Sequence, residues 1–332
     1  MVLKNYRTIV STQTYSGSAT TTVTDLPRDF LIQRIILDFY GTTTISSTST
    51  LVEDALLKCV KAIRIKAVGE GSSRTIFEVA GDDLYYLNFF DYGFSTALDN
   101  TDTTAAAHTQ TTGWTIDMRI NKNDPDDFSV AIPSYLLSTL QLEIEYDTSA
   151  NGYGTNVTSQ SFTMGITLIE GIPQPNENFA SNPLMTVLSK AITGDGTTGN
   201  EDFDTFFTVG ALIRRTFLRT ETSAGARSDD EINDYTVKSG QIPLMSIINY
   251  RANKTKDIEN YRLAELIDGF YDVKGFTMID FANNRQPFIP TSAGLKIDGL
   301  STQGYNVGDL LFSMDKANAS GLYVRVQESV EG

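Results

Sequence analysis

The chain has 332 residues, of which 40% are hydrophobic and 20% charged, and its formal net charge is −15. These totals predict one large domain or two of ordinary size with a packed core, and they exclude bulk disorder. The acidic balance disfavours nucleic-acid binding by the bulk of the fold, the single cysteine excludes an intrachain disulfide, and no apolar run reaches the roughly 18 residues that would predict a membrane span.

The first part of the chain has the character of strands separated by polar loops. Residues 1–30 are rich in Thr and Ser, and they lack the apolar core of a secretory signal. Leu31–Phe39 is too continuously apolar for a strand with one wet face, which predicts a strand buried on both faces. Gly41–Ser49 is predicted as a loop and Val52–Cys59 as a short helix with acidic residues near its N-terminus. Lys61–Val68 alternates between apolar and basic residues and predicts another strand.

A short aromatic helix or irregular segment is predicted from Gly81 to Gly93, followed by a polar loop over Ser95–Gly113. The strongest pattern then lies within Trp114–Asp147. Apolar and polar residues alternate strictly at its end, with Leu140, Leu142, Ile144 and Tyr146 on one side and Gln141, Glu143, Glu145 and Asp147 on the other. This period of two predicts a strand with one buried face and one wet face.

The second part of the chain follows a proline-rich linker. Gly171–Pro183 holds three of the nine prolines and few apolar residues, which predicts a boundary between two domains, residues 1–171 and 184–332, joined by residues 172–183. A long polar loop is predicted over Thr220–Asn233. A helix is predicted within Ile242–Leu263, with Pro243 at its first turn. One further strand is predicted before the linker, over Ser161–Ile169. After the linker, the apolar segments predict strands over Leu184–Ile192, Leu212–Arg219, Phe276–Phe281, Leu295–Ile297, Leu310–Met314 and Leu322–Gln327.

Several of these patterns occur twice in the same order, which predicts an internal duplication. Leu31–Leu37 resembles Leu212–Leu218. The cassette within Trp114–Asp147 has three counterparts near the C-terminus: Ile116-Asp117 matches Ile279-Asp280, Ile132-Pro133-Ser134 matches Ile289-Pro290-Thr291, and Leu142-x-Ile144 matches Leu295-x-Ile297. Short strands with turn signals between them favour antiparallel sandwiches over βαβ units. The fold class is therefore all-β with short helical inserts.

No motif in the sequence predicts a catalytic or cofactor-binding site. An acidic cluster offers the oxygen ligands that Ca²⁺ prefers, at Asn123, Asp124, Asp126 and Asp127, but the twelve-residue calcium-loop pattern is absent and the cluster is also a good turn. Gly194–Gly199 fits G-x-G-x-x-G, yet acidic residues follow at once and would repel phosphate, so a glycine turn is favoured. His108 is the only histidine, which excludes a zinc site built from several His and Cys residues.

Cys59 and Trp114 are both predicted to be core residues, without a chemical or binding role. Cys59 lies in an apolar run and is predicted to be a small buried hydrophobe, not a reactive thiol. Trp114 alternates with Ile116 and is predicted to lie in a core, not to form a sugar-binding platform.

The tandem β-domains, helical inserts and acidic Thr-rich surface resemble the double jelly-roll major capsid proteins of tailless icosahedral viruses, the lineage of tectiviruses, corticoviruses, adenoviruses and turreted archaeal viruses. The resemblance is carried as a pattern of elements in both halves, over residues 29–39, 56–69, 212–222, 242–263 and 275–284. It implies two tandem eight-stranded antiparallel jelly-roll sandwiches. It further implies a homotrimer with six jelly rolls, which forms a pseudo-hexameric tile of the virion shell.

The resemblance also implies partners and a location. The chain is expected to contact itself, neighbouring capsomers, and penton and minor capsid proteins, and to assemble in the host cytoplasm without a small-molecule substrate. An internal membrane or the genome is a further partner near the N-terminus, where Lys4 and Arg7 are the early cations. Two alternatives stay open: a glycosidase or amidase built from two jelly rolls, and a carbohydrate-binding viral spike or adhesin.

Overall fold

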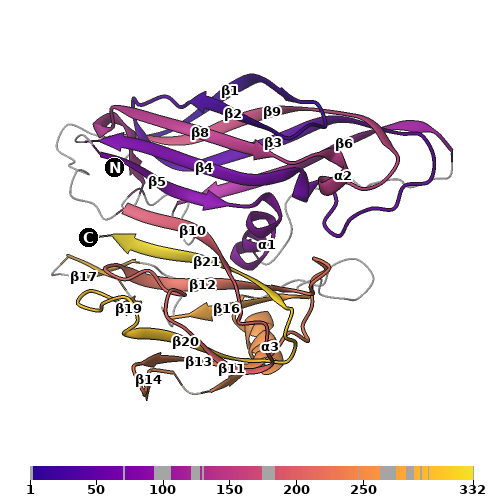
Figure 1. The fold of residues 1–332 in the computed structure, drawn as a ribbon. Helices are drawn as coiled ribbons and strands as arrows, with labels where there is room; N and C mark the ends of the chain where they lie inside the picture. Colours follow the sequence, from indigo (N-terminus) through magenta and orange to yellow (C-terminus); the bar gives the residue numbers. More distant parts are fainter. Residues whose placement is uncertain are drawn as a thin grey trace. The chain divides into compact units, whose positions relative to one another are not determined.

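The computed structural model describes residues 3–69, 72–92, 106–120, 128, 131–173, 184–245, 247–261, 274–281, 288–291, 294–297 and 299–331. The chain forms two compact units, Met1–Asp91 with Ser95–Leu184, and Tyr92–Phe94 with Met185–Gly332. We call them the N-terminal unit and the C-terminal unit (Figure 1). No helix in the described ranges is long and apolar enough to cross a membrane.

The described part of the N-terminal unit is built on eight main strands: β1 (Leu3–Tyr15), β2 (Thr20–Asp25), β3 (Leu31–Ile45), β4 (Val60–Gly69), β5 (Ser72–Val79), β6 (His108–Arg119), β8 (Thr139–Tyr146) and β9 (Val157–Ile172). They form two sheets, in the orders β1-β9-β3-β6 and β5-β4-β8-β2 (Figure 1). Numbered along the chain, these orders are first-eighth-third-sixth and fifth-fourth-seventh-second. This is the jelly-roll arrangement of antiparallel strands.

The C-terminal unit repeats this topology in its described residues. Its eight strands are β10 (Leu184–Ile192), β11 (Gly199–Phe203), β12 (Leu212–Glu221), β13 (Ile232–Ser239), β14 (Ile242–Pro243), β16 (Phe276–Asp280), β20 (Leu310–Lys316) and β21 (Leu322–Glu331). Their orders are β10-β21-β12-β16 and β11-β20-β13-β14, again first-eighth-third-sixth and second-seventh-fourth-fifth. The predicted all-β fold of two tandem jelly rolls is therefore confirmed.

Shorter elements complete the two units. The N-terminal unit carries α1 (Gly81–Tyr92), α2 (Ser149–Gly152), β7 (Ile132–Pro133) and two short 3₁₀ turns, η1 (Leu57–Cys59) and η2 (Ser134–Leu136). The C-terminal unit carries α3 (Tyr250–Tyr261), β15 (Ile248–Asn249), β17 (Phe288–Thr291), β18 (Gly294–Ile297) and β19 (Leu300–Ser301). In both units the longest helix lies between the fifth and sixth strands, as α1 or α3.

The duplication extends to a β-bulge. The predicted match of Leu31–Leu37 with Leu212–Leu218 places both segments on the third strand of their jelly rolls. The pairing of β3 with β9 skips Gln33, and the pairing of β12 with β21 skips Arg214, which is the matched residue. Because a bulge adds one residue to one strand and re-aims its side chains, two bulges at one matched position indicate a duplicated strand pair.

The helix of each unit also contacts the same position on its edge strand. On α1, Asn88 donates to the backbone oxygen of Asp117 at 2.7 Å and accepts from its nitrogen at 3.0 Å. On α3, Asn253 donates to the backbone oxygen of Met278 at 3.0 Å and Asp257 accepts from its nitrogen at 2.9 Å. Asp117 pairs with Ile36 on β3 and Met278 pairs with Phe217 on β12, and these partners match. Helix side chains thus satisfy the backbone of edge strands β6 and β16.

None of the three predicted cassette matches joins equivalent residues. Ile116-Asp117 and Ile279-Asp280 do lie on the sixth strands, β6 and β16, but Asp117 corresponds to Met278 and not to Asp280. Ile132-Pro133 forms β7, which pairs with Leu31 and Ile32 of β3, and the element at that place in the C-terminal unit is β19. The predicted counterpart, Ile289–Thr291, instead forms a hairpin with β18, and Leu295–Ile297 lies in β18, which is no counterpart of β8. Dipeptides such as Ile-Pro recur in β proteins without sharing a position, because they encode no pairing partner.

Several predicted element boundaries are also corrected. The strand β3 continues through Ile45, so the predicted loop over Gly41–Ser49 begins later, and β6 begins at His108, inside the predicted loop Ser95–Gly113. The predicted helix over Val52–Cys59 is only the short turn η1, because Asp54 and Leu56 have positive φ angles of 59° and 74°. A helix over such residues would be interrupted.

The helix predicted within Ile242–Leu263 is present as α3, but it begins at Tyr250, and Pro243 lies in β14. The pairing of β13 with the segment after it holds that segment extended, so tertiary contacts decide against a helical first turn at the proline. The predicted loop Thr220–Asn233 is shorter than expected, because β12 ends at Glu221 and β13 begins at Ile232.

Aromatic rings fill the core of the N-terminal unit. Trp114 stacks on Phe39 with ring centroids 4.8 Å apart and meets Phe162 edge-on at 5.1 Å. Tyr15 stacks on Phe162 and on Tyr146. These rings come from both sheets, and burial of each side chain contributes roughly 1.5–3 kcal/mol. The prediction that Trp114 is a core residue is confirmed.

The core of the C-terminal unit is also aromatic. Phe312 of β20 stacks on Phe206 with centroids 3.9 Å apart, and it lies 5.5 Å from the ring of Tyr235 on β13. Inward residues of the third and sixth strands, such as Leu218 and Ile279, belong to the same buried cluster. Each unit thus has a core within its own sandwich, as the duplication predicts.

Candidate assembly surfaces

The predicted acidic cluster at Asn123, Asp124, Asp126 and Asp127 lies outside the described residues. Among the residues that the structure describes, no group of three or more His, Cys, Asp or Glu side chains is arranged to hold a metal ion. The ring Nδ1 of His108 lies 2.8 Å from the backbone oxygen of Ala106, at the start of an edge strand.

The glycine-rich segment Gly194–Gly199 is a turn between β10 and β11, as predicted. Gly196 and Gly199 have positive φ angles of 78° and 98°, and a strand, not a helix, follows. Phosphate binding by this motif requires a helix N-terminus, so the dinucleotide interpretation is excluded. The buried amine of Lys316 instead pairs with Asp195 and Glu201 and ties this turn to β20.

Cys59 is buried, and its thiol lies 3.7 Å from the side-chain oxygen of Gln160. Burial raises the pKa of Cys59 to about 12, because a thiolate would lose its hydration there. The thiolate is the reactive form, so this cysteine is inert at neutral pH, and its predicted role as a buried hydrophobe is confirmed.

The wet face predicted for β8 carries a network of ion pairs with β4. Glu143 pairs with Arg64 at 2.9 Å and Lys66 at 2.5 Å, and Glu145 pairs with Arg64 at 2.7 Å and Lys61 at 2.8 Å. The hydrogen bond from Lys66 lowers the pKa of Glu143, and that from Lys61 lowers the pKa of Glu145. The network crosses two neighbouring strands and fixes their outer face as a charged surface.

A second charged cluster, which no sequence pattern predicts, is buried in the C-terminal unit. Arg215 donates to both oxygens of Glu328 at 2.6 and 3.0 Å, across the bulge between β12 and β21. Glu328 is only 1% exposed. Sequence alone places both residues on strands, and only the strand register brings them together.

Arg7, one of the two predicted N-terminal cations, is held in the N-terminal unit. It pairs with Asp29 at 2.8 Å and Glu170 at 3.0 Å, and it lies over the ring of Phe30 at 5.5 Å. Burial raises the pKa of Glu170, although Arg7 acts in the opposite direction. The charge of Arg7 is therefore compensated within the fold. Lys4 is exposed on β1, where it pairs with Gly171 of β9.

The connections of the N-terminal unit gather at two ends. At one end the turn after β1 meets α2, through a bond from Ser149 to Gly17 at 3.0 Å, and the turn after β3 meets the segment before β9, through a bond from Ser46 to Asn156 at 3.0 Å. At the opposite end, Leu26 bonds to Leu140 at 2.8 Å. The opposite end also carries the start of β1 and the end of β9, which pair with each other.

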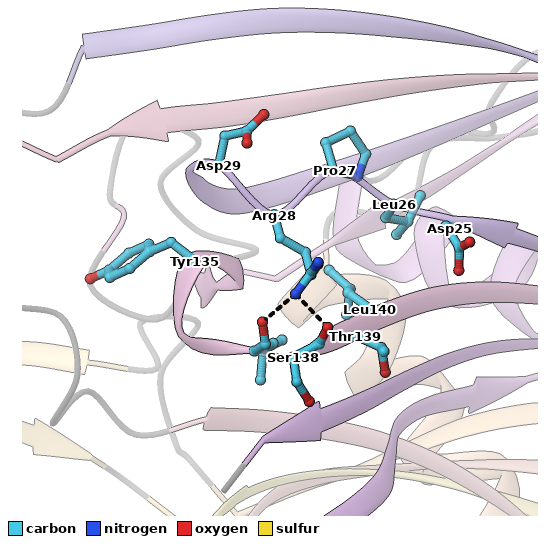
Figure 2. Close-up of a pocket in the computed structure, with 10 residues that line it drawn as sticks. Asp25, Leu26, Pro27, Arg28, Asp29, Tyr135, Ser138, Thr139 and Leu140 are labelled. Carbon is cyan, nitrogen blue, oxygen red and sulfur yellow. Dashed lines mark hydrogen bonds between the residues drawn. The ribbon is translucent and has the colours of Figure 1, made fainter.

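A pocket of about 630 Å³ lies at this opposite end (Figure 2). It is lined by residues from the β2–β3 connection and the segment before and at the start of β8: Asp25, Leu26, Pro27, Arg28, Asp29, Tyr135, Leu137, Ser138, Thr139 and Leu140. Arg28 reaches across it and donates to the backbone oxygens of Leu137, at 2.8 Å, and of Ser138. Figure 2 shows that Tyr135 lies at its rim.

The charged groups around the pocket already serve structural contacts. Asp29 accepts from Arg7 at 2.8 Å, Asp25 accepts from Gln141 at 2.9 Å, and Arg28 is engaged by backbone oxygens. The lining contains no histidine or cysteine that would provide a base or nucleophile. The pocket is therefore a surface recess with a largely polar lining, to which the buried residues Leu26 and Leu140 also belong.

An exposed apolar edge lies in the C-terminal unit. Ile242, Leu244 and Ile247 are 69%, 41% and 71% exposed, although they are large hydrophobic residues. They lie in the segment of β14 and β15, at the edge of the sheet beyond β13. We call residues 242–247 the apolar edge. The sequence does not predict this surface, because these residues lie within the segment Ile242–Leu263, for which a helix is predicted.

Comparison with solved structures yields extensive matches at low sequence identity. The major capsid protein of STIV matches with a TM-score of 0.71 and 14% identity, over 98% of this chain and 97% of that chain. A quasi-atomic model of the PBCV-1 virus capsid matches with a TM-score of 0.63 and 10% identity, over 100% and 96%. The major capsid protein P2 from bacteriophage PM2 matches with a TM-score of 0.59 and 12% identity, over 99% and 98%.

No protein-family model matches the sequence, and neither does any curated protein. The relation is therefore visible in the arrangement of strands and not in the residues themselves. Both jelly rolls, their order along the chain and nearly the whole length take part in each match. The chain has the double jelly-roll fold of these viral capsid proteins.

Proposed function

We propose that the protein is a major capsid subunit, which forms homotrimers that tile the shell of an icosahedral virion. One observation carries this proposal: the match to the STIV major capsid protein spans 98% of this chain and 97% of that chain, so neither partner has a large unmatched domain. Function would then lie in contacts between copies and not in a pocket.

The duplicated fold suits this role for a geometric reason. Three copies of a chain with two similar units present six similar units, so a trimer fills a six-sided position in a shell. The two units have also diverged in sequence, which lets each meet a different neighbour. We propose that the units correspond to domains of residues 1–171 and 184–332, with residues 172–183 as the linker; residues 174–183 of that linker lie outside the described ranges.

The finer parts of the proposal concern partners. We propose contacts with penton and minor capsid proteins, and assembly in the host cytoplasm. An internal membrane or the genome is proposed near the N-terminus. Lys4 and Arg7 are the cations there, and Arg7 already pairs with Asp29 and Glu170 within the fold.

No observation supports either of the two alternative functions. A glycosidase or amidase would need an acid–base constellation, and the charged residues of the described pocket, Asp25, Arg28 and Asp29, make structural hydrogen bonds. A carbohydrate-binding spike or adhesin that used Trp114 as its sugar platform is excluded, because this side chain is buried. We therefore propose a structural role and no catalytic one.

The oligomeric state tests this proposal directly. Light scattering of the purified protein at high concentration should give three times the chain mass of 36.5 kDa. Negative-stain images should show hexagonal tiles on the order of 80 Å across, the size of six compact domains side by side. A strictly monomeric protein under these conditions would contradict the proposal.

A further inference from the structure

The exposed apolar side chains of the described residues are unevenly distributed. Ten large hydrophobic residues are exposed, and five of them lie in just two places. Ile242, Leu244 and Ile247 form the apolar edge of the C-terminal unit. Tyr135 and Leu136, which are 37% and 46% exposed, lie on η2 in the N-terminal unit, and Tyr135 lines the pocket there. Clustered exposed apolar groups mark contact surfaces, whereas single ones are ordinary.

The chain segments that carry these exposed residues are free of charge in a strongly acidic chain, although Asp25, Arg28 and Asp29 also line the pocket beside Tyr135. Residues 239–249 and 128–142 contain no Asp, Glu, Lys or Arg, while the whole chain carries a net charge of −15. Two copies of such a chain repel each other over most of their surface. Uncharged apolar patches are where copies approach without bringing carboxylates together.

A proline in the apolar edge also prevents another strand from pairing with it. Pro243 lies on β14, at the end of the sheet path β11-β20-β13-β14, and it has no N–H to donate to another strand. A partner therefore meets this edge through side chains and not by extending the sheet. A projecting isoleucine needs a recess on its partner, and the pocket lined by Tyr135, Leu26 and Leu137 offers one of about 630 Å³.

Ring symmetry gives the reason for two different patches. In a closed ring of three copies every contact is between unlike surfaces, so each copy needs one patch to present and another to receive. The chain offers one apolar patch on each unit. We propose that the apolar edge of one copy, residues 242–247, packs against Tyr135, Leu136 and the adjoining pocket of a second copy of this chain. This inference rests on the proposed trimeric capsid function.

Chemical crosslinking between engineered cysteines tests the pairing of these patches. The double variant Leu136→Cys/Ile247→Cys, treated with a short bis-maleimide, should give covalent trimers on a denaturing gel, because each copy carries both halves of the contact. Each single variant should give only monomers. The native Cys59 is buried and does not interfere. A maleimide tolerates a longer span than a disulfide would.

The matched control replaces the apolar edge with another exposed residue of the same unit. Leu322 is 47% exposed at the start of β21, so Leu136→Cys/Leu322→Cys should give no covalent trimer. Covalent dimers from Ile247→Cys alone would mean that two apolar edges meet each other, and they would overturn the inference. So would a lack of crosslinks in a double variant that light scattering shows to be trimeric.

A second measurement separates this inference from the proposed function. Ile247→Asp should weaken trimer formation on the order of thirtyfold, as expected for an interface hot spot, while Leu322→Asp should change it by less than about threefold. Circular dichroism should show that both variants are folded. If the wild-type protein is trimeric and Ile247→Asp is equally so, only the choice of surface is wrong. If the wild-type protein is monomeric, the proposed capsid function fails as well.

Discussion

Hydrogen bonding and burial have opposite effects on the pKa of Asp257 on α3. Its carboxylate accepts from the Met278 nitrogen at 2.9 Å and the Thr277 hydroxyl at 2.8 Å, and both bonds favour the charged form. Burial opposes this effect more strongly and raises the pKa of Asp257 to about 7. Asn88 makes the corresponding contact on α1 with a neutral amide. The C-terminal unit therefore holds a titratable group where the N-terminal unit does not.

The variant Asp257→Asn should reveal this titration. An aspartate whose pKa is higher in the folded than in the unfolded state binds its proton more tightly when folded, so it stabilises the native state at low pH. The free energy of unfolding of the wild-type protein, relative to Asp257→Asn, should be greatest near pH 4 and should fall as the pH rises through about 7. Urea unfolding of both proteins across this range measures the difference.

Glu143→Gln provides a comparison of opposite sign. Its hydrogen bonds from Lys66 and Arg64 lower the pKa of Glu143 in the folded state. The wild-type protein should therefore lose stability relative to Glu143→Gln as the pH falls below about 4.3, the ordinary pKa of glutamate. An unfolding free energy difference for Asp257→Asn that stays constant between about pH 4 and 8 would contradict the titration assigned to Asp257.

At the scale of elements, glycine positions show how closely the strands of one sheet approach. Gly41 lies on β3, between Thr112 of β6 and Phe162 of β9. A Cβ atom added to Gly41 would lie 1.9 Å from the backbone oxygen of Ser161. Backbone atoms in a paired strand cannot move away without breaking the ladder. A glycine in the middle of a strand is therefore required here, although it weakens strands elsewhere.

We expect Gly41→Ala to destabilise the N-terminal unit by about 3 kcal/mol, at the upper end for overpacked sites. The matched control is Gly165→Ala on β9, whose added Cβ would lie 3.7 Å from the backbone oxygen of Asp38, an ordinary contact. Urea unfolding should show a clear loss for Gly41→Ala and little change for Gly165→Ala. Equal effects of the two substitutions would mean that strand propensity, and not the close approach, decides the cost.

At the scale of the whole molecule, the net charge of −15 sets how copies associate. Like-charged copies repel at long range, and salt screens this repulsion, with a screening length of about 10 Å at 0.1 M and 3 Å at 1 M. An apolar contact such as the one proposed for residues 242–247 is not weakened by that screening. Salt should therefore strengthen self-association.

The expected result is a trimer that forms at lower protein concentration as ionic strength rises from about 0.05 to 0.5 M. Light scattering over a dilution series at each salt concentration measures this shift. The Ile247→Asp variant should be weaker at every salt concentration but should respond to salt in the same direction. Dissociation of the wild-type trimer by salt would instead indicate an interface dominated by ion pairs.

The sequence by itself determined the class of the fold, because the relevant signals are local. The alternation from Leu140 to Asp147 predicts a strand with one wet face, and β8 has that face, with Glu143 and Glu145 in the ion-pair network. The repeated Leu31–Leu37 and Leu212–Leu218 segments predicted the duplication correctly. A period of two and a repeated string are properties of the chain that no partner needs to supply.

Only the tertiary structure decided which strands pair and which side chains stay exposed. The Ile-Pro matches failed because a dipeptide does not specify its partner strand, and Pro243 was misplaced in a helix because β13 holds that segment extended. Arg215 and Glu328 meet through a register that no local pattern encodes. The exposure of the apolar edge at residues 242–247 also depends on its position in the sheet. The same side chains would be buried in a central strand, but here they are exposed because β14 is the last strand of its sheet.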